Sequence, residues 1–251
     1  LKTLSFWNGE RAVAALHFYA VHPMSYYGKG GVSADFPGMA RAQRQADQPG
    51  VFQMYLSGCS GDVTAGKFND GNPANRPVLA AKLHDAMVRS WASTERHPLE
   101  RAALRTAALT LPVREQGDYT IPELEKILAD KEAKTFDRNL AAMGLAWRHR
   151  HDAGVPITVA AVDFGAAQYL LLPGESFVGY QLFAQAAGDG KFVVTAGYGE
   201  CAPGYIPTRE AEGEAFIEKH NWCWVSRGAY APMEAAIREV LGKQNGKRKE
   251  E

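Results

Sequence analysis

The sequence has 251 residues, of which 46% are hydrophobic and 22% are charged. These fractions match folded globular domains, so they exclude an intrinsically disordered chain and a fibrous protein. The 28 basic and 28 acidic side chains give a formal net charge of zero. This balance disfavours nucleic acid as a partner, because phosphate-binding surfaces need a basic excess. No apolar run approaches the roughly 20 residues of a membrane-spanning helix, so no transmembrane segment is expected.

Apolar runs separated by turn residues predict the first elements. Residues 11–21 and 51–56 are rich in aromatic, β-branched and other apolar side chains, which is typical of buried strands. Between them, residues 26–37 contain glycines and a proline at irregular spacing, and this pattern predicts a loop. Apolar side chains at four-residue intervals over residues 72–93 predict an amphipathic helix.

The middle of the chain is predicted to form a strand and then a long, interrupted helix. The strand covers residues 102–113. Thr120 and Glu123 have the spacing of a capping box, with a proline in the first turn, so a helix is expected to begin there. The apolar face continues to Trp147, and a break is expected near residues 131–134.

Strands and helices continue to alternate towards the end of the chain. A helix is predicted over residues 176–187, and a last helix is predicted to end at Gly242. Strands are predicted over residues 157–162, 167–172 and 191–198. This interleaving predicts one α/β domain over residues 1–242, with a mixed β-sheet flanked by helices. Residues 243–251 contain no apolar side chain and are expected to form a frayed, charged tail.

Two loops in the first third of the chain carry side chains suited to chemistry. His22 follows an apolar strand and precedes a proline, where it is either a functional imidazole or a hydrogen-bonded structural residue. The small-residue loop over residues 57–66 contains Ser60, Asp62 and Thr64. Its structural alternative is a tight turn in which Asp62 caps backbone N–H groups.

Two further loops of this kind follow later strands. Glu175 lies between a buried strand and a helix, where it is either a metal ligand or a charge that the helix dipole stabilises. The loop over residues 197–208 contains Tyr198 and Tyr205, which are either site residues or tyrosines that cover an edge of the core. If these loops converge, the site lies at the ends of strands.

Taken in order, these motifs resemble the catalytic domain of the neutral/alkaline ceramidases, the non-lysosomal zinc amidases. The resemblance extends from about residue 11 to about residue 208, and the order of the motifs gives it most of its weight. The matching segments are AVHP-x-S around His22, S-x-D-x-x-G over residues 33–38, GDV-[S/T] over residues 61–64, PGE ending at Glu175, and Y-x-x-T beginning at Tyr205.

The resemblance implies one zinc ion bound by two histidines, a glutamate and a tyrosine. Matched by motif, His22, Glu175 and Tyr205 correspond to three of these ligands, and zinc accepts imidazole and carboxylate groups. The family's other histidine lies in an N-terminal HxHSxPG-like segment, which this sequence does not contain. We therefore expect an upstream part of the same domain to lie outside this sequence.

The resemblance also implies a serine nucleophile, at a position where this chain has Thr64. Threonine keeps the hydroxyl but crowds it with a methyl group, so Thr64 is a candidate nucleophile, a weakened nucleophile or an orienting group. Ser60 is a second candidate, and Asp62 is expected to orient the nucleophile. Cys59 is disfavoured, because no histidine is marked as its partner.

The expected function is zinc-dependent hydrolysis of an amide bond in a ceramide-like N-acyl lipid, or in a related acyl amide or ester. Tyr26, Tyr27 and Phe36 are expected to offer apolar surface to an acyl chain, with Tyr198 as a further substrate-binding residue. One alternative is a degenerate family member that acts as a non-catalytic binding protein. Another is an unrelated α/β hydrolase with an acid and a hydroxyl around Asp62.

The partner and location follow from the same resemblance. The expected partner is a lipid or small-molecule amide substrate, and a separate N-terminal fragment of the same precursor is a further candidate. Family members imply a secreted or periplasmic location. Three cysteines at scattered positions form no disulfide pattern, and no signal peptide is visible, so a cytoplasmic location stays open.

Overall fold

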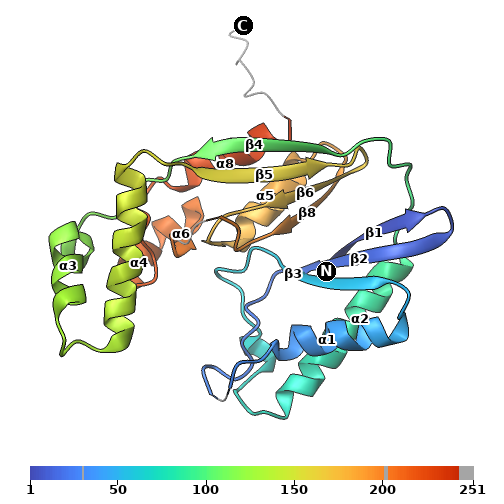
Figure 1. Cartoon of the computed structure of the whole chain (residues 1–251), viewed down its shortest axis with the longest axis horizontal. Helices are drawn as coiled ribbons and strands as arrows, with labels where there is room; N and C mark the ends of the chain where they lie inside the picture. Colours follow the sequence, from blue (N-terminus) through green and yellow to red (C-terminus); the bar gives the residue numbers. More distant parts are fainter. Residues whose placement is uncertain (30, 201–202, 243–251) are drawn as a thin grey trace, which may run out of the picture.

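The structure, a computed structural model, describes residues 1–29, 31–200 and 203–242. The tail predicted over residues 243–251 lies outside the described residues. The chain folds into two lobes, each with a β-sheet flanked by helices (Figure 1). Within the described ranges, no helix is long and apolar enough to cross a membrane.

The N-terminal lobe is a three-stranded mixed sheet with two helices on one face (Figure 1). Its strands, in sheet order, are β1 (Lys2–Asn8), β2 (Arg11–Tyr19) and β3 (Phe52–Ser57). β1 is antiparallel to β2, and β2 is parallel to β3. Helix α1 (Asp35–Asp47) connects the two parallel strands, and α2 (Asn75–Ala92) packs beside it. The predictions of β2, β3 and α2 are confirmed.

Two elements of this lobe were not predicted. β1 alternates Thr3 and Ser5 with apolar residues, and its polar face meets side chains of α2 instead of solvent, as the Thr3–Ser90 hydrogen bond shows. Helix α1 begins inside the segment predicted to be a loop. Pro37 lies in its first turn, where proline needs no backbone N–H partner, so this proline starts a helix.

The second lobe contains a four-stranded mixed sheet and a short two-stranded ladder. The large sheet has the order β4-β5-β6-β8, with antiparallel neighbours except for the parallel pair β6 and β8. The ladder pairs β7 with β9 in parallel. The strands are β4 (Ala103–Leu109), β5 (Ile157–Asp163), β6 (Ala167–Leu171), β7 (Glu175–Ser176), β8 (Phe192–Ala196) and β9 (Tyr205–Ile206).

Helices α5 and α8 cover one face of the large sheet, and α3 and α4 form a hairpin at its side (Figure 1). Thr120 accepts a hydrogen bond from Glu123 N at 3.4 Å, which confirms the predicted start of α3. The predicted break separates α3 from α4. The helices are α3 (Ile121–Ala129), α4 (Thr135–Asp152), α5 (Val178–Ala187), α6 (Arg209–Gly213), α7 (Phe216–Lys219) and α8 (Tyr230–Val240), with 3-10 turns η1 (Gly66–Phe68) and η2 (Gly117–Tyr119).

The expectation of one mixed sheet is wrong, because the strands divide between two mixed sheets and the short ladder. The two sheets contact each other along β8. Gly197 N, directly after β8, donates to Ser57 O of β3 at 3.0 Å, and Lys2 Nζ of β1 donates to Val193 O of β8 at 3.1 Å. An apolar cluster that includes Phe18 and Val194 packs between them. The carboxyl ends of β2, β3, β6 and β8 therefore approach one region, the position where α/β folds commonly bind ligands.

Candidate active site

The ladder of β7 and β9 brings Glu175 and Tyr205 together. The two residues are direct partners in the parallel pair, and Glu175 N donates to Gly204 O at 2.9 Å. On the other side, Tyr205 N donates to Trp222 O at 2.9 Å. Gly204 has φ of 71°, and a Cβ there would overlap the carbonyl oxygen of Trp222. This close approach explains the glycine before Tyr205.

His22 reaches this ladder from the end of β2. Its Nε2 lies 2.9 Å from Glu175 Oε2, and its Nδ1 donates to Val63 O at 3.2 Å. The His22 and Glu175 side chains are 15% and 18% exposed. The hydrogen bond to Glu175 raises the pKa of His22 against the opposing effect of burial. Because a carbonyl oxygen only accepts, Nδ1 carries a proton, and Nε2 is the nitrogen that can donate a lone pair to a metal.

Tyr205 lies beside this pair. Its ring centroid is 6.4 Å from that of His22, and the rings of Phe177 and Phe216 pack edge-on against it. Burial and, to a smaller extent, the charge of Glu175 raise the pKa of Tyr205. The structure thus brings together the three residues that the resemblance marks as zinc ligands.

Tyr198 also lies beside His22 and contacts Ser60. Their hydroxyl oxygens are 2.8 Å apart, and the Tyr198 ring stands edge-on to His22 with 6.1 Å between centroids. Tyr198 has φ of 59°, a left-handed conformation that is costly for a side chain of this size. Burial raises the pKa of Tyr198 to about 12. Ser60 is fully buried, so its hydroxyl orients Tyr198 and is not open to a substrate.

Asp62 and Thr64 make structural contacts, Asp62 with the start of α5 and Thr64 within its own loop. Asp62 Oδ1 accepts a hydrogen bond from Val178 N at 2.7 Å and so caps the first turn of α5. Thr64 Oγ1 accepts from Gly66 N at 2.9 Å, and the Thr64 side chain is exposed. Neither hydrogen bond involves His22 or Glu175. Asp62 thus caps a backbone N–H group, as in the structural alternative, but that N–H group belongs to α5 and not to a tight turn of its own loop.

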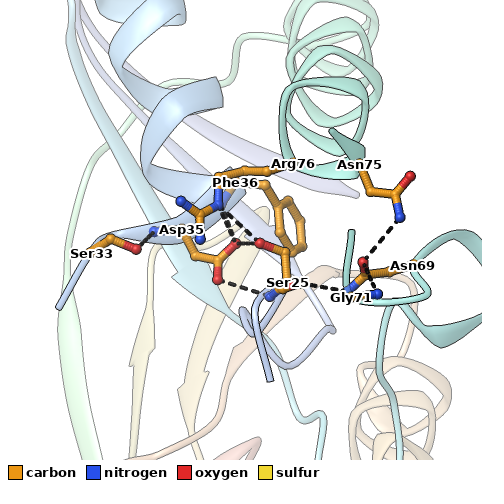
Figure 2. A network of polar contacts seen from close by, with 8 residues as sticks. All are labelled: Ser25, Ser33, Asp35, Phe36, Asn69, Gly71, Asn75 and Arg76. Atoms are coloured by element: carbon orange, nitrogen blue, oxygen red, sulfur yellow. Dashed lines mark hydrogen bonds and ion pairs between the residues drawn. The ribbon is translucent and has the colours of Figure 1, made fainter. Parts of the chain in front are cut away.

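A polar network fixes the loop that follows His22 (Figure 2). Ser25 donates its backbone N–H to Asp35 Oδ2 at 2.8 Å and its hydroxyl to Asp35 Oδ1 at 2.5 Å. Arg76 Nε donates to Ser25 Oγ at 3.1 Å, and Asn69 Nδ2 donates to Ser25 O at 3.0 Å. The S-x-D-x-x-G motif therefore contributes Asp35 as an anchor for the backbone three residues after His22.

The three residues expected to contact an acyl chain have different environments. The guanidinium of Arg76 lies over the Tyr26 ring, and Tyr27 Oη donates to Asn69 O at 3.3 Å. Tyr27 remains 42% exposed. Phe36 is only 3% exposed and belongs to the core cluster that α1 and α2 form with each other. The assignment of Phe36 to a substrate surface is corrected, because this side chain of α1 packs against apolar side chains of α2.

The cysteines take no part in the described site. Cys59 is fully buried, and desolvation raises the pKa of its thiol, which opposes formation of a nucleophilic thiolate. Cys223 is also buried and free. Cys201 lies outside the described residues.

The donors at the site fit part of a zinc centre. Ligands about 2.0–2.1 Å from a tetrahedral zinc ion lie about 3.3 Å apart, close to the 2.9 Å between His22 Nε2 and Glu175 Oε2. The Tyr205 hydroxyl would be a third donor, because the Tyr205 ring lies beside the His22 ring. In the part of the chain that the structure describes, no group of three or more His, Cys, Asp and Glu residues could hold a metal ion. Among the described residues, His22 and Glu175 therefore have the chemistry and the mutual spacing of two zinc ligands, and they do not complete a metal site.

Two cavities lie away from this cluster. The larger, of about 790 Å³, runs along β1, and its walls include Phe6, Trp7 and Phe164. The smaller, of about 280 Å³, is lined by residues that include Ala20 and Gln181. Neither cavity is lined by His22, Glu175 or Tyr205.

Fold and site together define an α/β protein in which an imidazole that follows β2 lies beside a carboxylate and a phenol from the first positions of β7 and β9. Two solved ceramidase structures are similar to this chain. The neutral ceramidase from Pseudomonas aeruginosa matches with a TM-score of 0.67 and 16% identity, over 95% of this chain and 45% of that chain. A ceramidase complexed with C2 matches with a TM-score of 0.66 and 14% identity, over 95% of this chain and 47% of that chain.

These matches show that the chain has a mixed α/β fold similar to that of the ceramidases, as the motifs predicted. The chain spans less than half the length of either structure. No protein-family model matches the sequence, and no curated protein does so. The likeness therefore concerns the fold, and the activity is a separate question.

Proposed function

We propose that this chain carries part of the active site of a zinc-dependent hydrolase that cleaves the amide bond of a ceramide-like N-acyl lipid, or of a related acyl amide or ester. The observation that carries the proposal is the 2.9 Å contact between His22 and Glu175, which are 153 positions apart in the sequence. The pairing of Glu175 with Tyr205 adds the third expected ligand. Similarity to two ceramidase structures supports the choice of substrate class.

His22 Nε2, Glu175 Oε2 and the Tyr205 hydroxyl would hold the metal. When bound, zinc supplies a Lewis acid that polarises the scissile carbonyl and lowers the pKa of a water molecule. The hydrogen bond from Nδ1 to Val63 O keeps the His22 ring in one orientation. We propose that the second histidine ligand comes from polypeptide outside this sequence, either the same chain or a separate fragment of its precursor.

The remaining groups would act on the substrate as nucleophile, as oxyanion donor and as binding surface. Thr64 presents an exposed hydroxyl and is the proposed nucleophile of this loop, because the Ser60 hydroxyl is buried against Tyr198. Tyr198 would contact the substrate beside His22, while Tyr205 or a backbone N–H of residues 57–64 would donate to the oxyanion. Tyr26 and Tyr27 would contact the acyl chain. A secreted or periplasmic location is part of the same proposal.

A non-catalytic binding protein is the second candidate. The threonine at the nucleophile position and the incomplete set of ligands among the described residues favour it. Under this alternative, a lipid amide binds near His22 but does not turn over.

Hydrolysis of a fluorescent N-acyl sphingosine by the full-length protein tests the proposal. The expected result is release of the fatty acid, which a zinc chelator stops and added zinc restores. Binding of the lipid without any release would favour the second candidate. Hydrolysis that continues in the presence of the chelator would contradict the zinc-dependent mechanism.

A further inference from the structure

Glu175 makes a second hydrogen bond that no sequence motif marked. Trp222 Nε1 donates to Glu175 Oε1, while Glu175 Oε2 lies 2.9 Å from His22 Nε2. The two carboxylate oxygens therefore have separate partners. We propose that Trp222 is a positioning residue, whose indole N–H holds Oε1 so that Oε2 is the oxygen presented to the metal. This inference rests on the proposed zinc site.

The backbone around the site places Trp222 within reach of Glu175. Residues 203–205 lie between two segments, because Glu175 N donates to Gly204 O and Trp224 N donates to Pro203 O at 3.1 Å. An antiparallel bridge also joins Gly204 to Cys223. The segment of Trp222 and the segment of Glu175 thus lie on opposite sides of residues 203–205, and the Trp222 side chain spans this strip to reach the carboxylate.

The segment that carries Trp222 is itself fixed. Arg114 N donates to Trp224 O at 2.9 Å, and an antiparallel bridge joins Val113 to Val225. The Trp222 and Trp224 rings pack at 5.4 Å between centroids. Because the backbone and ring are both held, the indole N–H has a defined direction towards Oε1.

An indole suits this role for chemical reasons. Its N–H is a donor only, so it neither removes the proton-accepting capacity of Oε2 nor competes with Glu175 for the metal. Hydrogen bonds from neighbouring residues to a side chain that binds a metal hold that side chain in the correct orientation. Their loss typically weakens metal affinity by about 10-fold to 100-fold. Trp222 is half-buried, which strengthens the hydrogen bond by excluding water.

The test compares Trp222→Phe with the unchanged protein by zinc competition against a chromophoric chelator. We expect zinc affinity to fall by about 10-fold to 100-fold in Trp222→Phe. Trp7→Phe is the matched control, because it removes an indole hydrogen bond, to Ser5 Oγ at 2.9 Å, from the distant β1. The control should keep the zinc affinity of the unchanged protein.

Two further measurements separate positioning from general damage to the fold. Chelator-treated Trp222→Phe should show the circular dichroism spectrum of the chelator-treated parent. The visible spectrum of the Co²⁺-loaded protein, which reports ligand geometry, should change in Trp222→Phe and not in Trp7→Phe. If the parent binds zinc and Trp222→Phe binds it equally well with the same Co²⁺ spectrum, this inference is overturned and the proposed function stands. If the parent binds no zinc, both fail.

Discussion

The ladder around Glu175 and the loop over residues 57–66 both carry residues that the motifs marked, but the structure uses the two regions differently. In the ladder, strand pairing places Glu175 against Tyr205, and His22 closes the group with a direct contact. In the loop, Asp62 caps a helix and Ser60 is buried against Tyr198. Backbone pairing thus fixes two of the proposed metal ligands, whereas Ser60 and Asp62 of the loop make structural contacts with Tyr198 and with the start of α5.

The largest expected effect is on the rate of amide hydrolysis, and it distinguishes the hydroxyl of Thr64 from that of Ser60. If Thr64 is the nucleophile, Thr64→Ala should lower the rate of amide hydrolysis by about 10³-fold or more, since a nucleophile acts in the transition state. Thr64→Ser should retain or raise the rate. Ser60→Ala should cost less than about 10-fold, because Ser60 acts through Tyr198. Steady-state kinetics measures these rates. If Ser60→Ala abolished turnover and Thr64→Ala did not, Ser60 would be the nucleophile instead of Thr64.

Asp35 provides the next largest effect, on stability. Asp35→Ala removes both hydrogen bonds to Ser25 and should lower the free energy of unfolding by about 1–3 kcal/mol. Urea denaturation measures this loss. The exposed Asp85 on α2 provides a matched control, and Asp85→Ala should change stability by less than about 0.5 kcal/mol. Equal effects at both positions would show that the network does not anchor the loop.

The contact between His22 and Glu175 predicts a pH dependence in metal-free protein. The folded-state pKa of His22 is raised above its ordinary value of 6.5, so protonated His22 stabilises the fold. This contribution is fully present below the unfolded-state pKa and is lost as the pH rises through the folded-state pKa. Glu175→Gln should therefore cost on the order of 1 kcal/mol at pH 5.5 and less at pH 9. A cost that does not change with pH would contradict the ion pair.

Asp62 gives the smallest expected effect. Asp62→Asn keeps an oxygen that can accept from Val178 N, whereas Asp62→Ala removes the cap and should cost about 1 kcal/mol of stability. If capping is the whole role of Asp62, hydrolysis by folded Asp62→Asn should stay close to that of the parent. A large loss of kcat in Asp62→Asn would restore the orienting role predicted from the motif.

The sequence predicted the elements that are marked by apolar spacing or by a helix cap within the element itself. The four-residue spacing of Leu79, Leu83 and Met87 gave α2 its apolar face, and the side chain of Thr120 caps α3 as expected. Helix α1 was missed because Pro37 and Gly38 suggest a loop when the start of the helix is unknown. The division into two sheets was missed because strand order depends on contacts between distant segments, which no local pattern encodes.

For the candidate site, the sequence predicted the residues that lie in motifs but not the contacts that depend on packing and burial. Motif order marked His22, Glu175 and Tyr205, and the fold brings them together. The partnership of Trp222 with Glu175 had no sequence signal, since it arises from the packing of residues 203–205 between two other segments. The roles of Ser60 and Phe36 were also beyond sequence analysis, because burial decides them.

The central claim is that His22, Glu175 and Tyr205 bind one divalent cation. Elemental analysis of the full-length protein, purified without chelator, tests it most directly, with His84→Ala as control, because His84 pairs with Asp47 on the surface at 2.6 Å. The account predicts about one zinc ion per chain in the parent and in His84→Ala, and loss of zinc in His22→Ala and Glu175→Ala. A parent protein without zinc, or zinc that persists in both ligand variants, would contradict it.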